Sequence, residues 1–210
     1  MVTVNERIAR IQHILAHLEP NKVTLLTGSN GSGKSLVRKQ CCFELSRKLP
    51  GTDPLKLTAD VSMQRRTESN AMLGALSNCM HDNPDEPTSC YTYYLVKTLF
   101  NSFAKADVGS KRYLIIDEPE IGMSKESQLG FAAYLKSKIP EALDHTYGLL
   151  IITHSDIIVN ALKDEAAFFN MDKDCTVEEW LNREIVPTDF ETLDDASHEL
   201  FLAINNYSKG

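Results

Sequence analysis

The chain has 210 residues, 42% of them hydrophobic and 24% charged, which is ordinary for a globular protein of one domain. Its 22 basic and 29 acidic side chains give a formal net charge of −7, which disfavours a general role in clamping polyanions. The longest apolar run, Tyr147–Ile152, is far shorter than the roughly 20 residues that cross a bilayer, and the charged N-terminus does not resemble a secretory signal. Five cysteines, an odd number typical of reduced thiols, lead us to expect a cytoplasmic protein without a membrane span.

Helices and short apolar strands alternate along the chain. Each helix is predicted from apolar residues at helical spacing and each strand from a short apolar run, with breaks at proline and glycine. In chain order the predicted elements are a helix over residues 5–18, a strand over 23–27, a glycine-rich loop over 28–33, a helix over 33–48, a strand over 56–61, a loop over 82–89, a helix over 90–106, a strand over 113–116, a helix over 125–138, a strand over 148–153, a helix over 156–162 and a strand over 166–170. This alternation predicts an α/β fold with a mainly parallel central sheet and ligands at the carboxyl ends of the strands.

The acidic excess lies entirely in the last forty residues. Residues 171–210 hold 10 acidic and 3 basic side chains, whereas residues 1–170 hold equal numbers. We therefore predict a core over 1–170 and an acidic extension over 171–210 that holds none of the site chemistry. Apolar residues such as Trp180 predict that the extension packs on the core, with helices near 177–183 and 194–207.

A glycine-rich segment follows the first predicted strand. Residues 28–35 read Gly-Ser-Asn-Gly-Ser-Gly-Lys-Ser, which fits the pattern G-x-x-x-x-G-K-S without a gap and opens a helix. Phosphate oxygens need several inward-pointing N–H donors, and a glycine-rich turn at a helix N-terminus supplies them. Lys34 is expected to bridge the β- and γ-phosphates and the Ser35 hydroxyl to hold Mg²⁺. The residues expected to contact the nucleotide are Gly28, Ser29, Asn30, Gly31, Ser32, Gly33, Lys34, Ser35 and Leu36.

Two later strands end in residues that suit phosphate hydrolysis. Asp117 and Glu118 follow the run Tyr113–Ile116, in a strand expected to lie next to the glycine-rich loop. Asp117 is expected to orient Mg²⁺ through water, and Glu118 to act as general base for the attacking water. His154 follows the next apolar strand, where its imidazole is expected to face the γ-phosphate and steady the water.

Together these three segments resemble the ABC-type ATPases, and the ending Ile152-Thr-His-Ser-Asp156 is closer to the soluble ATPases of DNA repair, defence and maintenance than to transporters. The resemblance implies a three-layer P-loop NTPase fold with a reduced helical subdomain. It makes the glycine-rich loop the Walker A motif, Asp117 the Walker B acid, Glu118 the catalytic glutamate and His154 the switch histidine. It also implies ATP and Mg²⁺ as ligands, and a homodimer that closes around two nucleotides.

The resemblance extends to two further positions. In that family a glutamine between the first two motifs touches Mg²⁺ and the attacking water, and Gln64 stands in a suitable place after a predicted strand. The family also grips the partner's γ-phosphate with an LSGGQ-like segment; none occurs here, and Ser89 is the positional counterpart, with capping of the following helix by Thr88 or Ser89 as the alternative. Ser124 stands where the family commonly has an acidic residue, and no aromatic residue precedes Gly28 to stack on adenine.

The predicted function is hydrolysis of the β–γ phosphoanhydride bond of ATP, with ATP-driven dimerisation that powers the conformational cycle of a protein partner. Three alternatives stay open: a nucleotide-gated assembly module with little hydrolysis, the ATP-binding subunit of a transporter, and a kinase with Arg65-Arg66 in a lid. Only 83 positions separate Lys34 from Asp117, which leaves little room for the helical subdomain that docks on a transporter. A GTPase is disfavoured because no N-K-x-D segment follows a later strand.

Nucleic-acid contact stays open but has no support beyond short basic pairs. These pairs are Arg38-Lys39, Arg47-Lys48 and Lys111-Arg112, and each is expected to be solvated surface.

Overall fold

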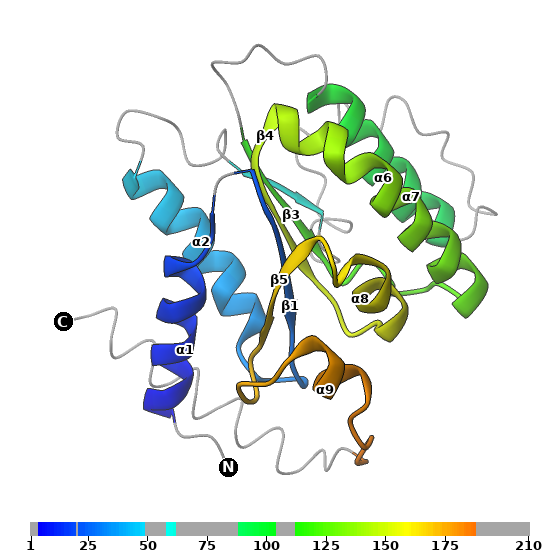
Figure 1. The fold of residues 1–210 in the computed structure, drawn as a ribbon. Coiled ribbons are helices and arrows are strands. Elements are labelled where there is room, and N and C mark those ends of the chain that lie inside the picture. Colours follow the sequence, from blue (N-terminus) through cyan, green and yellow to red (C-terminus); the bar gives the residue numbers. More distant parts are fainter. Residues whose placement is uncertain (1–3, 20, 49–57, 62–87, 104–111, 188–210) are drawn as a thin grey trace.

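The computed structural model of the protein describes residues 4–19, 21–48, 58–61, 88–103 and 112–187 (Figure 1). The described helices are α1 (Val4–Ala16), α2 (Lys34–Lys48), α6 (Thr88–Phe103), α7 (Lys125–His145), α8 (Asp156–Leu162) and α9 (Val177–Leu181). The described strands are β1 (Val23–Thr27), β2 (Thr58–Val61), β3 (Arg112–Asp117), β4 (Thr146–Ile152) and β5 (Ala166–Asn170). The helix predicted over 194–207 and the reduced subdomain expected between the first two motifs fall largely or wholly outside these residues.

The five described strands form one sheet in the order β2-β3-β4-β1-β5, and every neighbouring pair is parallel. The predicted α/β class with a parallel sheet is confirmed. Strand β4 lies between β1 and β3, the strand that ends in Asp117. Residues 148–152 of β4 are buried without exception, as suits a strand covered on both faces at the centre of a parallel sheet.

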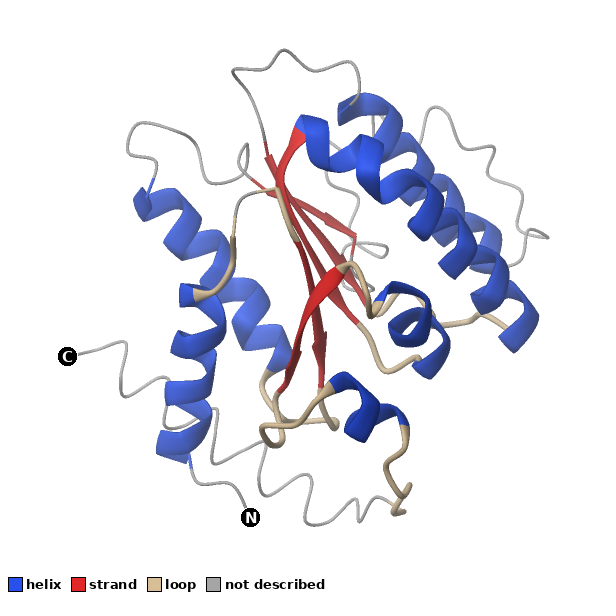
Figure 2. Cartoon of the chain, viewed as in Figure 1, coloured by secondary structure: helices blue, strands red, loops and turns tan. Residues whose placement is uncertain are grey.

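Helices cover both faces of the sheet and make three layers. Figures 1 and 2 show α1 and α2 on one face and α6, α7 and α8 on the other. Alternate strand residues serve the two sides: Leu114 and Ile116 pack in the cluster under α6, α7 and α8, whereas Ile115 packs in the cluster under α1 and α2. This alternation follows from the two-residue repeat of a strand, and it explains why each strand reads as a continuous apolar run.

Helix α7 is longer than the sequence predicts. The predicted helix ends at Lys138, two residues before Pro140, which lacks a backbone N–H and disfavours helix in the residue before it. The structure continues the helix to His145 through Pro140, which is exposed. The apolar stripe continues across the proline, with Ile139 and Ala142 buried in the same face, so that tertiary packing overrides the local preference.

The start of the acidic extension packs on both faces of the sheet. Met171 is buried in the cluster beneath α1 and α2, and Trp180 is buried in the cluster on the opposite face. Helix α9 is begun by a capping box, in which Thr176 and Glu179 each bind the other's backbone N–H. The guanidinium of Arg183 lies 3.6 Å from the centre of the Trp180 ring and covers its outer side.

Candidate functional site

The polar segments predicted to carry chemistry meet at one edge of the sheet. Because all described strands are parallel, the residues that follow β1, β3, β4 and β5 lie at the same edge. The edge therefore gathers the glycine-rich loop after β1, Asp117 and Glu118 at the end of β3, and His154 after β4. Residues that follow β5 join them, which the sequence analysis did not expect.

The glycine-rich loop turns tightly between β1 and α2. Its three glycines have φ values of 147° at Gly28, 72° at Gly31 and 105° at Gly33, a backbone region that side chains rarely adopt. Gly28 is also required by space, because a Cβ there would lie 2.7 Å from Ser32 Oγ and 2.8 Å from Met171 Cβ. The Ser32 hydroxyl is buried and has no hydrogen-bond partner within the described structure. A buried hydroxyl without a partner is costly unless a ligand completes it.

Lys34 begins α2 and is only 6% exposed. Its Nζ donates to the carbonyl oxygens of Gly28 and Ser29, at 3.0 Å and 2.9 Å, so the amino group is folded over its own loop. Burial lowers the pKa of Lys34, while the surrounding carboxylates, Glu118 foremost, act in the opposite direction. The loop thus presents a buried cation that faces several acids, at the positive end of a helix.

Asp117 is bound from α2 rather than left open to solvent. The Nε atom of Arg38 lies 3.5 Å from Asp117 Oδ2, and the two side chains are 9% and 14% exposed. The prediction that Arg38 belongs to a solvated basic pair is wrong, whereas its neighbour Lys39 is exposed. The sequence did hold a signal for Arg38: it lies four residues after Lys34, which puts both cations on the same face of α2.

Glu118 combines an unusual backbone with a direct contact to His154. Its φ is 48°, in the left-handed region that costs a non-glycine residue about 1 kcal/mol or more. Its N–H donates to the carbonyl of Ile152 at 2.8 Å, which ties the turn after β3 to the end of β4. The Nε2 atom of His154 lies 3.1 Å from Glu118 Oε1. This hydrogen bond lowers the pKa of Glu118, against a smaller opposing effect of burial.

A neighbouring acid, Glu120, is fully engaged by the turn after β4. Its Oε1 accepts from the backbone N–H of His154 at 2.6 Å, and its Oε2 accepts from the Thr153 hydroxyl at 2.8 Å. The sequence alone predicts no role for Glu120. The signal was weak, because a third acid three residues after a strand is ordinary and its partners lie more than thirty residues away.

Asp172 is a second residue that the sequence analysis missed. Its Oδ2 accepts from the Ser29 N–H and its Oδ1 from the Ser29 hydroxyl, both at 2.7 Å. The carboxylate also lies close enough to Lys34 to oppose the lowering of its pKa. The acidic extension therefore reaches the glycine-rich loop, although no site residue was expected after position 170. The contact depends on the pairing of β5 with β1, which brings the residue two positions past β5 to the loop and which no sequence pattern indicates.

The oxygen donors expected to hold Mg²⁺ are Ser35, Asp117 and Gln64. Ser35 is exposed in the first turn of α2, and Asp117 is partly buried at the end of β3. One carboxylate and one hydroxyl fit Mg²⁺, which binds few protein oxygens and keeps several waters or phosphate oxygens. No cluster of three or more histidine, cysteine or acidic side chains that could hold a metal occurs in the part of the chain that the structure describes.

Other predicted residues lie beside this site or outside the described residues. Gln64 lies outside them. Thr88 and Ser89 fall inside the first turn of α6, which begins at Thr88, rather than ahead of it at the cap, and their side chains are not described. Ser124 has a structural role, since it caps α7 by accepting a hydrogen bond from the N–H of Ser127 at 3.2 Å.

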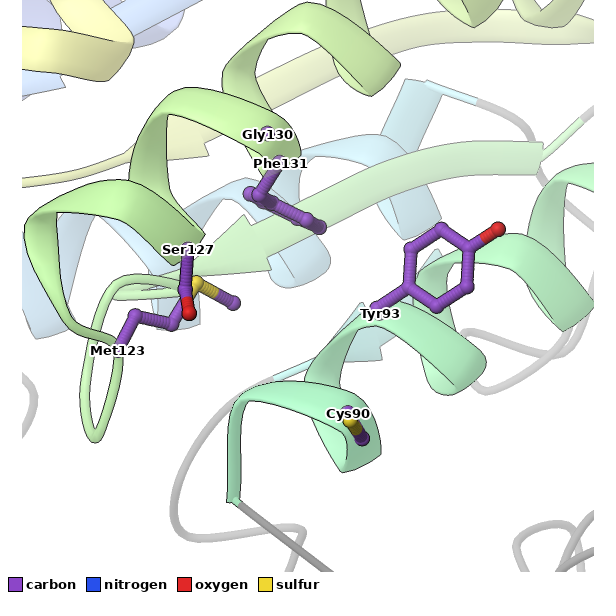
Figure 3. Close-up of a pocket in the computed structure, with 6 residues that line it drawn as sticks. All are labelled: Cys90, Tyr93, Met123, Ser127, Gly130 and Phe131. Carbon is purple, nitrogen blue, oxygen red and sulfur yellow. The ribbon is translucent and has the colours of Figure 1, made fainter.

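A separate cavity lies between α6 and α7, with a volume of about 240 Å³. Figure 3 shows its walls: Cys90 and Tyr93 from α6 face Ser127, Gly130 and Phe131 from α7, with Met123 from the preceding loop. None of these residues belongs to the glycine-rich loop. The cavity is therefore distinct from the polar sheet edge.

Among the described helices, none has the length and apolar character needed to cross a membrane. When the sequence is compared with known protein families, no family model matches it. No curated protein matches it either.

Proposed function

We propose that this chain binds Mg·ATP at the glycine-rich loop and hydrolyses the β–γ phosphoanhydride bond. The observation that carries the proposal is the convergence at one sheet edge of the buried Lys34 amino group and the contacting pair Glu118 and His154. A loop of inward N–H donors, a buried cation and an activated water are what phosphoryl transfer to water requires. This proposal makes the fold a P-loop NTPase of the ABC-ATPase type.

Binding rests on residues 28–36. The glycines allow the backbone to approach the phosphates closely, and the unpartnered Ser32 hydroxyl is a donor available to them. Lys34 exchanges its carbonyl partners for β- and γ-phosphate oxygens, since it already stands over the loop. Ser35 and Asp117 would hold Mg²⁺, which when bound neutralises phosphate charge and acts as a Lewis acid.

Hydrolysis rests on Glu118 and His154. A water oxygen bonds to the γ-phosphorus, the bond from that phosphorus to the β–γ bridging oxygen breaks, and ADP leaves. Glu118 accepts the water's proton as the new bond forms. A carboxylate with a lowered pKa is a modest base, so much of its contribution is to orient the water, and His154 shares the charge through its contact with Glu118.

The resemblance to the ABC-type ATPases extends this proposal to an ATP-dependent homodimer that is coupled to a partner protein. In such a dimer Ser89 would contact the nucleotide of the partner copy, and closure on ATP with opening after hydrolysis would drive a partner's conformational cycle. An assembly module would bind ATP but show little turnover. A transporter subunit would bind a membrane protein as its partner.

The binding half of the proposal is tested by replacing Lys34. Lys34→Met is expected to weaken Mg·ATP binding at least about tenfold, because it removes a buried cation from the phosphate site. Lys39→Met is the matched control, since Lys39 is exposed on the same helix. Binding is measured by isothermal titration calorimetry. Equal affinities for wild type and Lys34→Met would show that the loop is not the nucleotide site.

A further inference from the structure

Both carboxylate oxygens of Glu120 form hydrogen bonds with the turn that carries His154. Its charge also acts on Lys34, whose pKa it raises, after the larger effects of Glu118, Asp172 and Asp117. One carboxylate oxygen accepts the His154 backbone N–H at 2.6 Å and the other accepts the Thr153 hydroxyl at 2.8 Å. Hydrogen bonds to an ionised acceptor are about twice as strong as those between neutral groups. Glu120 is thus a bridge from the segment after β3 to the turn after β4.

The bridge continues through the turn itself. Thr153 Oγ1, which donates to Glu120, accepts the N–H of Ser155 at 3.0 Å. On the far side of His154, the Ser155 hydroxyl donates to Gln128 Oε1 at 2.7 Å and caps α8. The Gln128 side chain in turn donates to the Met123 carbonyl at 3.2 Å. The turn is therefore held on both sides of His154 by residues that follow Glu118 in the chain.

These hydrogen bonds fix the backbone of His154 opposite Glu118. The Nε2 atom of its imidazole lies 3.1 Å from Glu118 Oε1. Both side chains are about one-third exposed, so surrounding side chains do not by themselves prevent rotation of the ring. The Glu118 backbone is itself held, by its N–H to the Ile152 carbonyl. Glu120 supplies the corresponding anchor for the histidine.

We propose that Glu120 is a positioning residue that holds His154 at the Glu118 carboxylate and thereby sets the turnover of the site. This inference rests on the proposed function for its kinetic consequence, and on the geometry alone for the placement of His154. Glu120 is not the proposed base, because its two oxygens bind the turn, whereas Glu118 contacts the His154 imidazole.

The test is a double-mutant cycle that combines Glu120→Ala with His154→Ala. Glu120→Ala is expected to lower kcat by about 10- to 100-fold, the cost of misplacing a group by about 1 Å, with the KM for Mg·ATP within about twofold of wild type. In the His154→Ala background the same change is expected to have almost no further effect, because its action passes through His154. Glu141→Ala, which removes an exposed acid on α7, is the control and is expected to leave kcat unchanged.

The conservative variants separate positioning from general structure. Glu120→Gln keeps an oxygen for the His154 N–H and offers an amide N–H to Thr153 Oγ1, so it should retain most of kcat. Glu120→Asp is about 1.5 Å shorter and should behave like alanine. Thermal melts of each variant show whether the fold persists. Additive effects of Glu120→Ala and His154→Ala, or a loss confined to KM, would overturn the proposal.

A readout without turnover keeps this inference separate from the proposed function. In ¹⁵N-labelled protein, the ring signals of His154 are identified as those absent from His154→Ala. Glu120→Ala is expected to shift them, and Glu141→Ala to leave them in place. If the wild-type protein shows no ATP turnover, the proposed function is refuted, but the positioning of His154 by Glu120 is not. If the His154 ring signals do not move in a folded Glu120→Ala variant, the positioning of His154 by Glu120 is refuted.

Discussion

Arg38 and Asp117 form a largely buried ion pair beneath the candidate site, with Arg38 Nε 3.5 Å from Asp117 Oδ2. The pair joins α2, which opens with Lys34, to the end of the strand that carries Glu118. A buried carboxylate is stable only with a counter-charge, and here the helix after the glycine-rich loop supplies it. The two halves of the proposed active site are thus coupled before any ligand binds.

Removal of this guanidinium is expected to destabilise the fold. Arg38→Met removes the guanidinium that pairs with the largely buried Asp117 and should lower the free energy of unfolding by about 3 kcal/mol, measured by urea denaturation. Lys39→Met, an exposed change of the same kind on α2, should have little effect. Added Mg²⁺ should restore more stability to Arg38→Met than to wild type, because the cation can neutralise Asp117. Equal stabilities of Arg38→Met and Lys39→Met would mean that the ion pair contributes nothing.

Asp172 places a negative charge beside the loop that is proposed to bind phosphate. Asp172→Asn keeps an oxygen to accept the Ser29 N–H but removes the charge, so Mg·ATP should bind about threefold more tightly at low ionic strength. The gain should shrink as salt screens the interaction. Asp174→Asn makes the same charge change at a 96% exposed side chain and is the control. An identical gain in both variants would attribute the effect to net charge and not to the loop contact.

Two residues in α7 are unfavourable for a helix and are exposed. Pro140 lacks the N–H that would bind the carbonyl four residues earlier, and a Cβ on Gly130 would meet nothing within 4 Å. Pro140→Ala should raise the free energy of unfolding by about 1–3 kcal/mol and Gly130→Ala by about 1 kcal/mol. Thermal and urea unfolding measure both changes. A destabilised Pro140→Ala would mean that the proline's restriction of the unfolded chain outweighs its cost in the helix.

The sequence predicted best where the determinants are local. The strand Val23–Thr27, the helix Asp156–Leu162 and the strand Ala166–Asn170 have the predicted bounds, because each is a short, mainly apolar segment with polar or turn-forming residues close to both ends. The contiguous pattern of residues 28–35 likewise predicted a tight glycine-rich turn before a helix. The continuation of α7 beyond Lys138 was not predicted, because the local cost of Pro140 is overridden by the buried face of the helix.

The site residues that escaped prediction have partners far away in the chain. From the sequence, Arg38 and Lys39 were expected to be a solvated basic pair. In the fold, Arg38 is buried and forms an ion pair with Asp117. Glu120 and Asp172 have no motif, and each gains its role from strand order: β4 beside β3 brings the His154 turn to Glu120, and β5 beside β1 brings Asp172 to Ser29. Spatial order of strands is set by tertiary packing, so these contacts were beyond the reach of periodicity and spacing.

The central claim is that Glu118 drives hydrolysis of ATP, and the most direct measurement is phosphate release at saturating Mg·ATP by wild type, Glu118→Gln and the control Glu141→Gln. We expect wild type and Glu141→Gln to turn over alike, and Glu118→Gln to lose about 100-fold or more in kcat while it binds Mg·ATP within about twofold of wild type. Steady-state turnover that is unchanged in Glu118→Gln would contradict the account.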